Sequence, residues 1–597
     1  MFSSVQPDVP TTDVSGPRDE IQLSSTEKKV TRFLLDVLEY HSSDATLRIA
    51  GGWVRNKLLG LDSDDLDIVT DTISGETLAN LIVEYQAHTG RRKSAFGIIS
   101  RNPDQSKHLE TVTIRLFGLD IDINQLRSET YASGSRIPTV NTKFAFVPKF
   151  FRISHFFFDS AQVEVAEPVE DALRRDFTLN ALFYNIGTRC VEDFTHLGRQ
   201  DLADGILRTP MDPVITLRDD PLRMLRGLRF MATYNFSLDA DFVAACGAVR
   251  AREQLEQKVS RERMGIEVQK MFGSMGFVRA ADKIAEFKLE QVLVGSDAGK
   301  SIQQSPITKT SLEAMHLVMS SPTSPKPTPC LNTPIDPALP MAAYFLAMHP
   351  LAGALSSTNQ SSTEVDALFG AVEQLRDCSW TSVVLDVSSD QTPKSFGDLL
   401  NTQSFAAAQD FGIALQRLLI LAEDNLDEAV CRQLKLPKKL MKQIARLQTA
   451  GIAFAVARPS PALHDGGSSD IALEAFTALW AQWTGVKHCD SALSVATVAA
   501  AVSQLVQDSA SGYAPGIEDI RSAVATCKFP AINPTIIDIA SRPPIVNGGD
   551  AIHAGVPTGK AVGTFLSAAK VLEVAAKDRP LPLRETILAW ISSSASV

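Results

Sequence analysis

Two aspartates separated by one residue, Asp65 and Asp67, are the clearest chemical feature of the sequence. Residues 65–69, Asp-Leu-Asp-Ile-Val, alternate polar and apolar side chains, as in a half-buried β-strand. Successive strand side chains point to opposite faces, so both carboxylates are expected on the same face. Paired carboxylates repel each other unless a cation lies between them, and hard oxygen ligands near a phosphate favour Mg²⁺. The pair therefore predicts a magnesium site, with Asp65 and Asp67 as metal ligands and catalytic residues.

A glycine pair and an arginine precede the aspartates and predict an anion site. Residues 47–50 form a short apolar strand that ends at Gly51 and Gly52. Glycines allow an unusual turn and let a phosphate approach backbone N–H groups closely. A helix is expected over residues 54–59, and Arg55 is placed where its guanidinium would clamp the anion through two hydrogen bonds. A nucleoside triphosphate with one or two Mg²⁺ explains both features.

The segment Leu47–Asp71 resembles the head-domain signature of the nucleotidyltransferase superfamily, in the branch of the CCA-adding tRNA nucleotidyltransferases and bacterial poly(A) polymerases. Asn56 departs from that pattern, which usually has an aspartate after the arginine. The resemblance extends over residues 44–275. It implies an enzyme that uses CTP, ATP and Mg²⁺ to add C, C and A to the 3′ end of tRNA without a nucleic-acid template. No obligate protein partner is evident.

A second Asp-x-Asp lies in residues 119–123, which are also predicted as a strand. Asp120 and Asp122 share one face of it, and antiparallel pairing would bring one of them beside Asp65 and Asp67. The resemblance suggests Asp122 as the third catalytic carboxylate. An exposed strand charge is the alternative, and the choice between the two aspartates stays open.

The run Arg-Arg-Asp-Phe-Thr-Leu-Asn-Ala-Leu, residues 174–182, resembles the second motif of the family. By this resemblance, Arg174 and Arg175 meet the triphosphate, and Asp176 and Asn180 hold the ribose or order the loop. An arginine pair by itself is usually a solvated surface, so the interpretation depends on the whole run.

Residues 219–232 are predicted as a helix with three arginines on one face. At about 100° per residue, Arg223, Arg226 and Arg229 fall within one arc, opposite an apolar arc. The resemblance suggests that Arg226 and Arg229 hold phosphates together with Gly52.

Asp220 and Arg223 match the family motif that reads the base. Cytosine and adenine both present an exocyclic amine beside an unprotonated ring nitrogen, and uracil and guanine present the reverse. A carboxylate that accepts from the amine and a guanidinium that donates to the nitrogen would therefore select C and A.

The predicted fold class is α+β: a nucleotidyltransferase head with a mixed β-sheet and helices, followed by an all-α neck, body and tail. A length of 597 residues requires several domains. Local periodicity predicts helices over residues 25–40 and 78–89 and a strand over residues 111–116. The expected segments are a disordered tail 1–24, a head 25–185, a neck 186–275, a body 276–458 and an RNA-binding tail 459–597.

Residues 143–162 contain seven phenylalanines and interrupt the family pattern. An insertion, such as translated intron sequence, is the favoured interpretation, and an RNA-stacking loop is the alternative. A poly(A) polymerase or a CC- or A-only adding enzyme has the same motifs and stays a rival function. A non-catalytic RNA-binding protein inactivated by this insertion is the second rival.

Composition limits the partners and the compartment. The net charge of −11 gives no global attraction for nucleic acid, so RNA must bind local basic patches such as residues 432–446, for which a solvated helix face is the alternative. Seven cysteines without a C-x-x-C pair fit a reducing compartment. No apolar run approaches a membrane span, and the acidic N-terminus predicts a cytoplasmic protein. A nuclear location, and a mitochondrial form from an upstream start, stay open.

Overall fold

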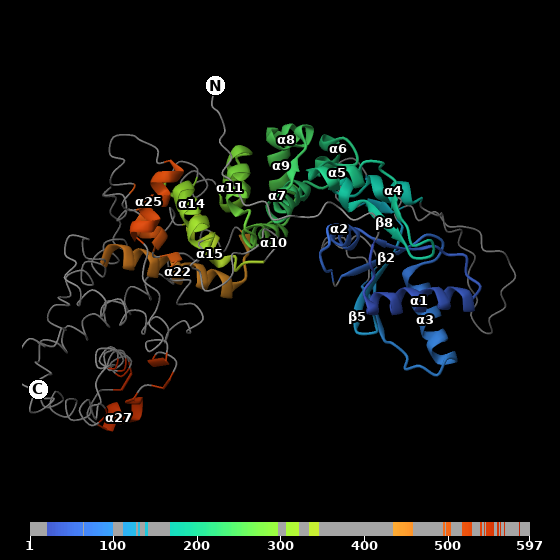
Figure 1. The fold of residues 1–597 in the computed structure, drawn as a ribbon, viewed down its shortest axis with the longest axis horizontal. Helices are drawn as coiled ribbons and strands as arrows, with labels where there is room; N and C mark the ends of the chain where they lie inside the picture. The colour runs from blue at the N-terminus through green and yellow to red at the C-terminus, as the bar shows by residue number, and fades with distance from the viewer. Residues whose placement is uncertain are drawn as a thin grey trace, which may run out of the picture. The chain divides into compact units, whose positions relative to one another are not determined.

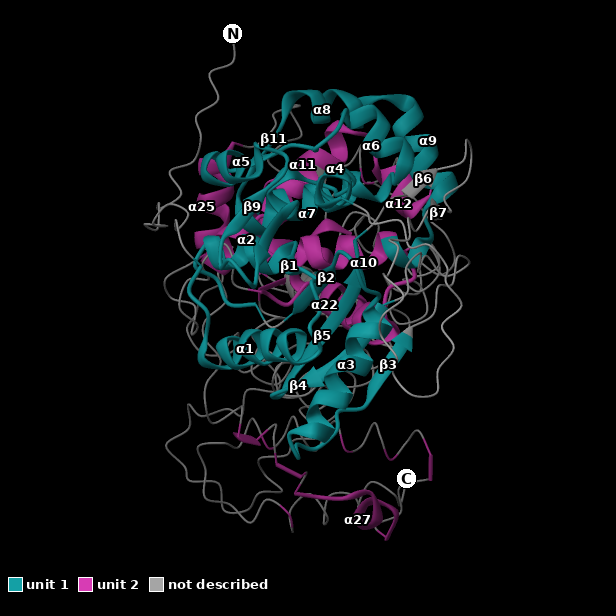
Figure 2. Cartoon of the chain, turned by 90° about the vertical axis from the view of Figure 1, so that its right-hand side faces the viewer, with its two compact units in different colours: residues 1–263 teal, residues 264–597 magenta. Residues whose placement is uncertain are grey.

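A computed structural model describes residues 21–63, 65–99, 111–126, 129–131, 138–140, 167–295, 302, 306–320, 334–345 and 434–457. Beyond residue 493 it describes short stretches and single residues, among them 516–527 and 545–553. The Phe-rich segment 143–162 and most of the expected tail 1–24 lie outside the described residues. The chain divides into two compact units, residues 1–263 and 264–597 (Figure 2). The expected domain boundaries stay predictions.

The first unit is built on a mixed β-sheet, as the sequence predicts. Its described strands are β1 (Leu47–Ala50), β2 (Leu66–Thr70), β3 (Phe96–Ile99), β4 (Thr111–Leu116), β5 (Leu119–Gln125), β8 (Leu182–Asn185) and β9 (Val191–Asp193). They lie in the order β3-β4-β5-β2-β1-β8-β9. The pair β2·β5 is parallel and the other neighbours are antiparallel.

The parallel pairing corrects the antiparallel arrangement expected from the sequence. Helix α3 (Gly75–His88) follows β2 and carries the chain back before β3, so β3 runs in the direction of β2. Two antiparallel reversals, β3 to β4 and β4 to β5, then return the chain to that direction. The parallel register places Asp67 directly opposite Asp122.

Helices α1 (Ser25–Tyr40) and α3 pack against each other, and α3 packs on β4 and β5 (Figure 1). Helix α1 has the predicted bounds. It begins at a capping box, in which the Ser24 side chain accepts from the backbone N–H of Glu27 and the Glu27 carboxylate accepts from that of Ser24. The same carboxylate accepts from Trp53 Nε1 at 2.9 Å and pairs with Lys57 Nζ at 2.9 Å. These contacts fix α1 against α2 (Gly52–Leu58).

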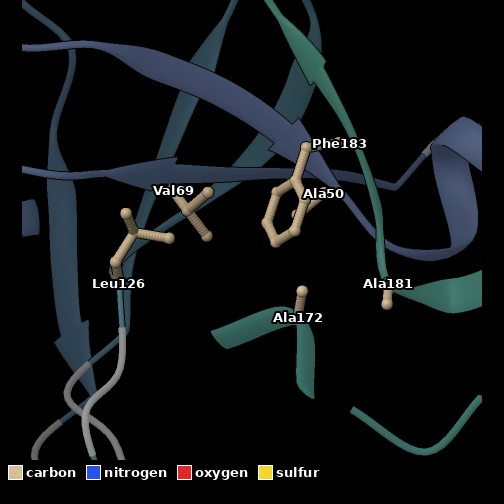
Figure 3. Packing of buried hydrophobic residues seen from close by; sticks show 6 residues of the cluster. All are labelled: Ala50, Val69, Leu126, Ala172, Ala181 and Phe183. Atoms are coloured by element: carbon tan, nitrogen blue, oxygen red, sulfur yellow. The ribbon is translucent and has the colours of Figure 1, made fainter. Parts of the chain in front are cut away.

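An apolar cluster lies where β1, β2 and β8 meet helix α4 (Pro168–Leu173) and the 3₁₀ turn η2 (Thr178–Asn180) (Figure 3). Its buried members are Ala50, Val69, Leu126, Ala172, Ala181 and Phe183. The small alanines let α4 and η2 approach the sheet closely around the Phe183 ring. Residues 174–177, which join α4 to η2, are thereby held beside the end of β1.

Short helices complete the first unit. They are α5 (Gly198–Asp204), α6 (Pro213–Asp219), α7 (Leu222–Tyr234), α8 (Ala240–Gly247) and α9 (Val249–Lys258), with α10 (Arg261–Phe272) at the division between the units. Two small sheets pair β10 (Ile206–Leu207) with β11 (Ser237–Leu238) and β6 (Glu129–Tyr131) with β7 (Pro138–Val140). Helix α7 is the predicted arginine helix. A Cβ at its Gly227 would lie 2.8 Å from Phe242 and 3.1 Å from Phe177, so this glycine permits the close packing of α7.

The regular elements described in the second unit are all helices, in agreement with the predicted body and tail. Its helices are α11 (Phe277–Glu286), α12 (Glu290–Val294), α14 (Pro306–Ser320), α15 (Ala338–Tyr344), α22 (Lys438–Ala457), α25 (Ile517–Cys527) and α27 (Gly548–His553). In α22, Leu440, Ile444 and Leu447 are buried as expected, and Lys438, Lys439 and Lys442 are exposed. Among the described residues, no helix is long and apolar enough to span a membrane.

Candidate active site

A cavity of about 380 Å³ lies in the first unit, between the glycine turn after β1, the segment joining α4 to η2, and helix α7. Every nucleotide-binding residue expected from the sequence lines it, together with Asp67; Asp65 and Asp122 are not among the lining residues. The lining residues are Gly51, Gly52, Arg55, Asp67, Asp171, Arg174, Arg175, Asp176, Asn180, Asp220, Arg223, Arg226, Arg229 and Phe230. The cavity therefore gathers motifs that lie far apart in the sequence around one space, which is lined by six arginines and four aspartates.

Gly51 forms the turn between β1 and α2 with φ 73° and ψ −132°, a backbone conformation that is essentially limited to glycine. Its N–H donates to the carbonyl of Leu182 in β8 at 3.2 Å, which anchors the turn to the sheet. A Cβ at Gly51 would lie 3.0 Å from Arg175 Nη1. Helix α2 begins at Gly52, earlier than the expected start at residue 54, so the glycine pair belongs to the turn and the first helical residue.

Arg55 is buried, with 5% of its surface exposed, and its guanidinium is held by protein groups. Nε and Nη2 donate to Asn56 Oδ1 at 3.1 and 2.8 Å, Nη2 donates to the Tyr234 hydroxyl at 2.7 Å, and Nη1 donates to Asn180 Oδ1 at 2.5 Å. A guanidinium has five N–H donors, so these contacts leave one. A two-bond clamp on an anion would require one of these contacts to break, because neighbouring elements already supply the acceptors, and the clamp stays a prediction.

Of the three candidate catalytic aspartates, Asp67 and Asp122 lie on the adjacent strands β2 and β5, and Asp65 immediately precedes β2. Asp65 and Asp67 are exposed on one face, with Leu66 between them buried on the other, as the strand pattern predicts. Asp122 lies beside Asp67 in the parallel register and accepts from Thr113 Oγ1 at 2.6 Å. Asp120 instead pairs with Arg115 at 3.6 Å, with 68% of its side chain exposed.

The donor set fits a magnesium ion only in part. Among the described residues, no group of three or more His, Cys, Asp or Glu side chains is gathered closely enough to enclose a metal. Magnesium, however, usually binds one or two carboxylates and completes its shell with water and substrate phosphates. Asp65 and Asp67 offer oxygen ligands alone and are open to solvent, which matches that mode of binding.

The two arginines of the second motif have different surroundings. Arg175 Nε and Nη2 donate to Asp171 Oδ2 at 3.1 and 2.8 Å, and its guanidinium lies 4.8 Å from the centre of the Phe183 ring. The backbone carbonyl of Arg174 accepts a hydrogen bond from Arg223 Nη2 at 2.6 Å, and its half-buried side chain lines the cavity. Arg175 is thus held in contact with the glycine turn.

Asp176 connects the second motif to α7. Its carboxylate accepts from Arg226 Nε at 2.8 Å and from Asn180 Nδ2 at 2.9 Å, and Arg226 Nη2 lies 2.6 Å from it. Burial by itself would raise the pKa of this carboxyl group, but the Arg226 charge and the Asn180 hydrogen bond outweigh burial and hold the pKa well below its usual range. Asp176 is therefore ionised, and it orders the loop around η2.

Asp220 and Arg223 lie at the start of α7, and one nitrogen of the Arg223 guanidinium has no hydrogen-bond partner among the described residues. Asp220 Oδ2 pairs with Arg263 Nη2 at 3.3 Å. Arg223 is 9% exposed, and its Nη1 is buried without a hydrogen-bond partner in the described part of the chain. A buried donor without an acceptor is costly. Since Arg223 lines the cavity, a ligand with an acceptor atom there would satisfy this group.

Three residues around the cavity were not expected from the sequence. Asp171 pairs with Arg175 one helical turn later, a spacing that is readable in the sequence. Phe230 lies under the Arg229 guanidinium at 4.3 Å, and the Tyr234 hydroxyl contacts Arg55. Phe230 and Tyr234 are four residues apart in α7, and the sequence interpretation of that helix assigned neither a role.

Comparisons with known proteins agree with these motifs. Residues 47–208 match the family model described as Poly A polymerase head domain. The chain is 41% identical over 285 residues to the mitochondrial CCA tRNA nucleotidyltransferase of Saccharomyces cerevisiae, over 46% of this chain and 48% of that protein. It is 43% identical over 262 residues to tRNA nucleotidyltransferase cca2 of Schizosaccharomyces pombe, over 42% of this chain and 49% of that protein.

The chain spans about half the length of the curated relatives that it matches. A solved structure of the Thermotoga maritima CCA-adding enzyme complexed with tRNA aligns with 96% of this chain and 96% of that chain. The identity in that alignment is 14% and the TM-score is 0.47.

Proposed function

Residues 47–208 match the Poly A polymerase head domain family model, and on that premise we propose that the chain is a CTP(ATP):tRNA nucleotidyltransferase. It adds C, C and A to the 3′ end of tRNA without a nucleic-acid template. The observation that carries this proposal is that a candidate metal ligand, Asp67, lines the same cavity as the base-reading pair Asp220 and Arg223.

The unpartnered Nη1 of Arg223 supports the base-reading role. Cytosine N3 and adenine N1 are acceptors, and either would satisfy this buried donor. Uracil and guanine present an N–H at the corresponding position and would leave it unpaired, at a cost of about 1–3 kcal/mol. Asp220 accepts from the exocyclic amine, and its contact with Arg263 holds the carboxylate in place.

The remaining residues divide the chemistry of phosphoryl transfer. Asp65 and Asp67 would hold Mg²⁺, which when bound neutralises phosphate charge and lowers the pKa of the attacking 3′-hydroxyl. Asp122 is the third carboxylate in this proposal, because it lies beside Asp67 whereas Asp120 is paired with Arg115. Arg174, Arg226 and Arg229 hold the phosphates, and the glycine turn lets them approach the backbone.

The basic face of α22 is a candidate contact for the tRNA backbone. Lys435, Lys438, Lys439 and Lys442 are exposed within one short stretch, whereas the chain as a whole carries a net charge of −11. Local patches of this kind bind phosphates by shape and charge, with strong salt dependence.

The cytoplasm is the proposed location. The Saccharomyces relative is named as a mitochondrial protein, so a mitochondrial form from an upstream start belongs to the same proposal. Fractionation of cells that express the tagged natural protein tests it, and a purely mitochondrial signal would contradict the cytoplasmic form.

The direct test of the activity is incorporation on a tRNA transcript that lacks CCA, with Mg²⁺ and each triphosphate alone or together. Sequencing of the products is expected to show C, C and A and no further addition. A long A tract would identify a poly(A) polymerase, and CC or A alone would identify a partial enzyme. Absence of any incorporation by the intact chain would leave only the non-catalytic RNA-binding alternative.

A further inference from the structure

A polar contact outside the expected motifs joins the end of helix α7 to helix α2. The Tyr234 hydroxyl accepts from Arg55 Nη2 at 2.7 Å and donates to Asn56 Oδ1 at 3.1 Å. Its ring lies 4.6 Å from the Arg55 guanidinium carbon, and the Phe230 ring lies 5.1 Å from the same carbon. The three residues Arg55, Asn56 and Tyr234 therefore form a closed ring of hydrogen bonds, hereafter the lock.

The lock holds a buried positive charge with neutral partners. No ion pair in the described part of the chain involves Arg55, and all of its recorded hydrogen bonds end on amide or hydroxyl oxygens. Asn56 stands where the related family usually has aspartate. Its single Oδ1 accepts from Arg55 Nε, Arg55 Nη2 and the Tyr234 hydroxyl. An amide oxygen has two lone pairs, so three donors share two sites on Asn56, and the Tyr234 hydroxyl oxygen gives Arg55 Nη2 a further acceptor.

The lock also connects the two halves of the cavity. Arg55 Nη2 lies 3.4 Å from the position that a Cβ on Gly52 would occupy, so it lies against the glycine turn proposed to bind phosphate. Tyr234 is the last residue of α7, and the base-reading Arg223 lies in the first turn of the same helix. A change in the lock would therefore alter the spacing between the turn and α7, although Tyr234 does not line the cavity.

We infer that Tyr234 is a positioning residue, whose hydroxyl fixes Arg55 and thereby sets the distance between the phosphate turn and the base-reading helix. This inference rests on the proposed function. A nucleotide held by its phosphates at the turn presents its base to Arg223 only when that distance is right. A wrong distance between these elements lowers kcat more than it weakens nucleotide binding.

The test compares Tyr234→Phe with the wild-type chain in single-nucleotide kinetics on tRNA primers, using all four triphosphates. The variant keeps the ring against Arg55 and removes only the hydroxyl. The kcat for CTP and ATP is expected to fall about tenfold, with KM changed less than about threefold. The preference for CTP and ATP over UTP and GTP is expected to narrow, a result that a general loss of folded protein does not produce.

The rescue variant is Asn56→Asp in the Tyr234→Phe background. A carboxylate offers two oxygens to Arg55 Nε and Nη2, so it holds the guanidinium in place without the Tyr234 hydroxyl. At least half of the lost kcat and the original base preference are expected to return. Tyr184→Phe is the matched control, because Tyr184 is 3% exposed in β8 and outside the cavity lining. It is expected to keep the wild-type kcat and base preference.

Wild-type kcat and base preference in Tyr234→Phe would overturn the inference. So would a loss that is equal for all four nucleotides, or one that Asn56→Asp does not reverse. These outcomes are distinct from failure of the proposed function, which appears as no incorporation by the wild-type chain itself.

Discussion

Replacement of Gly51 by alanine is expected to damage both the stability of the first unit and its use of nucleotides. At φ 73° and ψ −132°, Gly51 adopts a conformation that costs an L-residue about 1–3 kcal/mol. The new Cβ would also lie 3.0 Å from Arg175 Nη1, so the guanidinium must shift. Arg175 is held at 2.8 and 3.1 Å by Asp171, and weakening that half-buried pair costs up to about 1 kcal/mol.

The sum is about 1–4 kcal/mol in the free energy of unfolding. Gly90→Ala is the matched control, because Gly90 also has a positive φ of 68° but no heavy atom lies within 4 Å of the added Cβ. It isolates backbone strain, at about 1–2 kcal/mol. Urea unfolding of the two variants and the wild type measures both values.

The functional effect separates the two variants further. At a temperature where both are folded, Gly51→Ala is expected to raise KM for CTP and ATP more than about tenfold, because the phosphate-binding turn itself changes. Gly90→Ala should leave KM unchanged. Equal destabilisation by the two substitutions would refute the steric part of the reasoning. A normal KM in Gly51→Ala would refute the assignment of this turn to phosphate binding.

Asp67→Ala is expected to abolish incorporation of both CTP and ATP while tRNA affinity, measured by filter binding, stays near the wild-type value. Near-normal addition of either nucleotide would contradict the metal assignment. Asp220→Ala and Arg223→Ala should each lower kcat/KM for CTP and ATP by roughly one to two decades and narrow the advantage over UTP and GTP. An equal loss for all four nucleotides would mean that base selection lies elsewhere. Asp176 has a depressed pKa in the folded chain, so its ion pair contributes stability that is fully present above about pH 4 and is lost as pH falls through the folded pKa. Asp176→Asn should remove this part of the pH dependence of the free energy of unfolding. If that free energy falls equally in the variant and the wild type between pH 6 and about pH 3, the ion pair does not contribute.

The local elements were predictable because their causes are local. Helix α1 has the predicted bounds, since Ser24 and Glu27 form a capping box and the apolar residues recur at helical spacing. The alternation from Asp65 to Val69 correctly predicted that Leu66 would be buried and Asp67 exposed. Most of the residues that line the cavity belong to motifs that are recognisable as short, continuous runs, whereas Asp171 and Phe230 were not expected.

The sequence could not predict what each arginine contacts. Arg55 lies in a helix next to the glycine turn, but its acceptors Asn180 and Tyr234 are 125 and 179 residues away. Only folding shows that these acceptors reach the guanidinium and occupy the donors expected to clamp an anion.

The direction of β5 was misjudged for the same reason. It depends on the reversals made by the intervening helix and strands, and a strand has the same period of two in either direction. The sequence by itself determined the short motifs and which face of each local element their residues occupy. Tertiary structure alone decided the parallel register that sets Asp67 beside Asp122, the lock around Arg55 and the unpartnered nitrogen of Arg223. Local periodicity sets a residue's face, whereas hydrogen-bond partners come from elements whose contact depends on the packing of the whole unit.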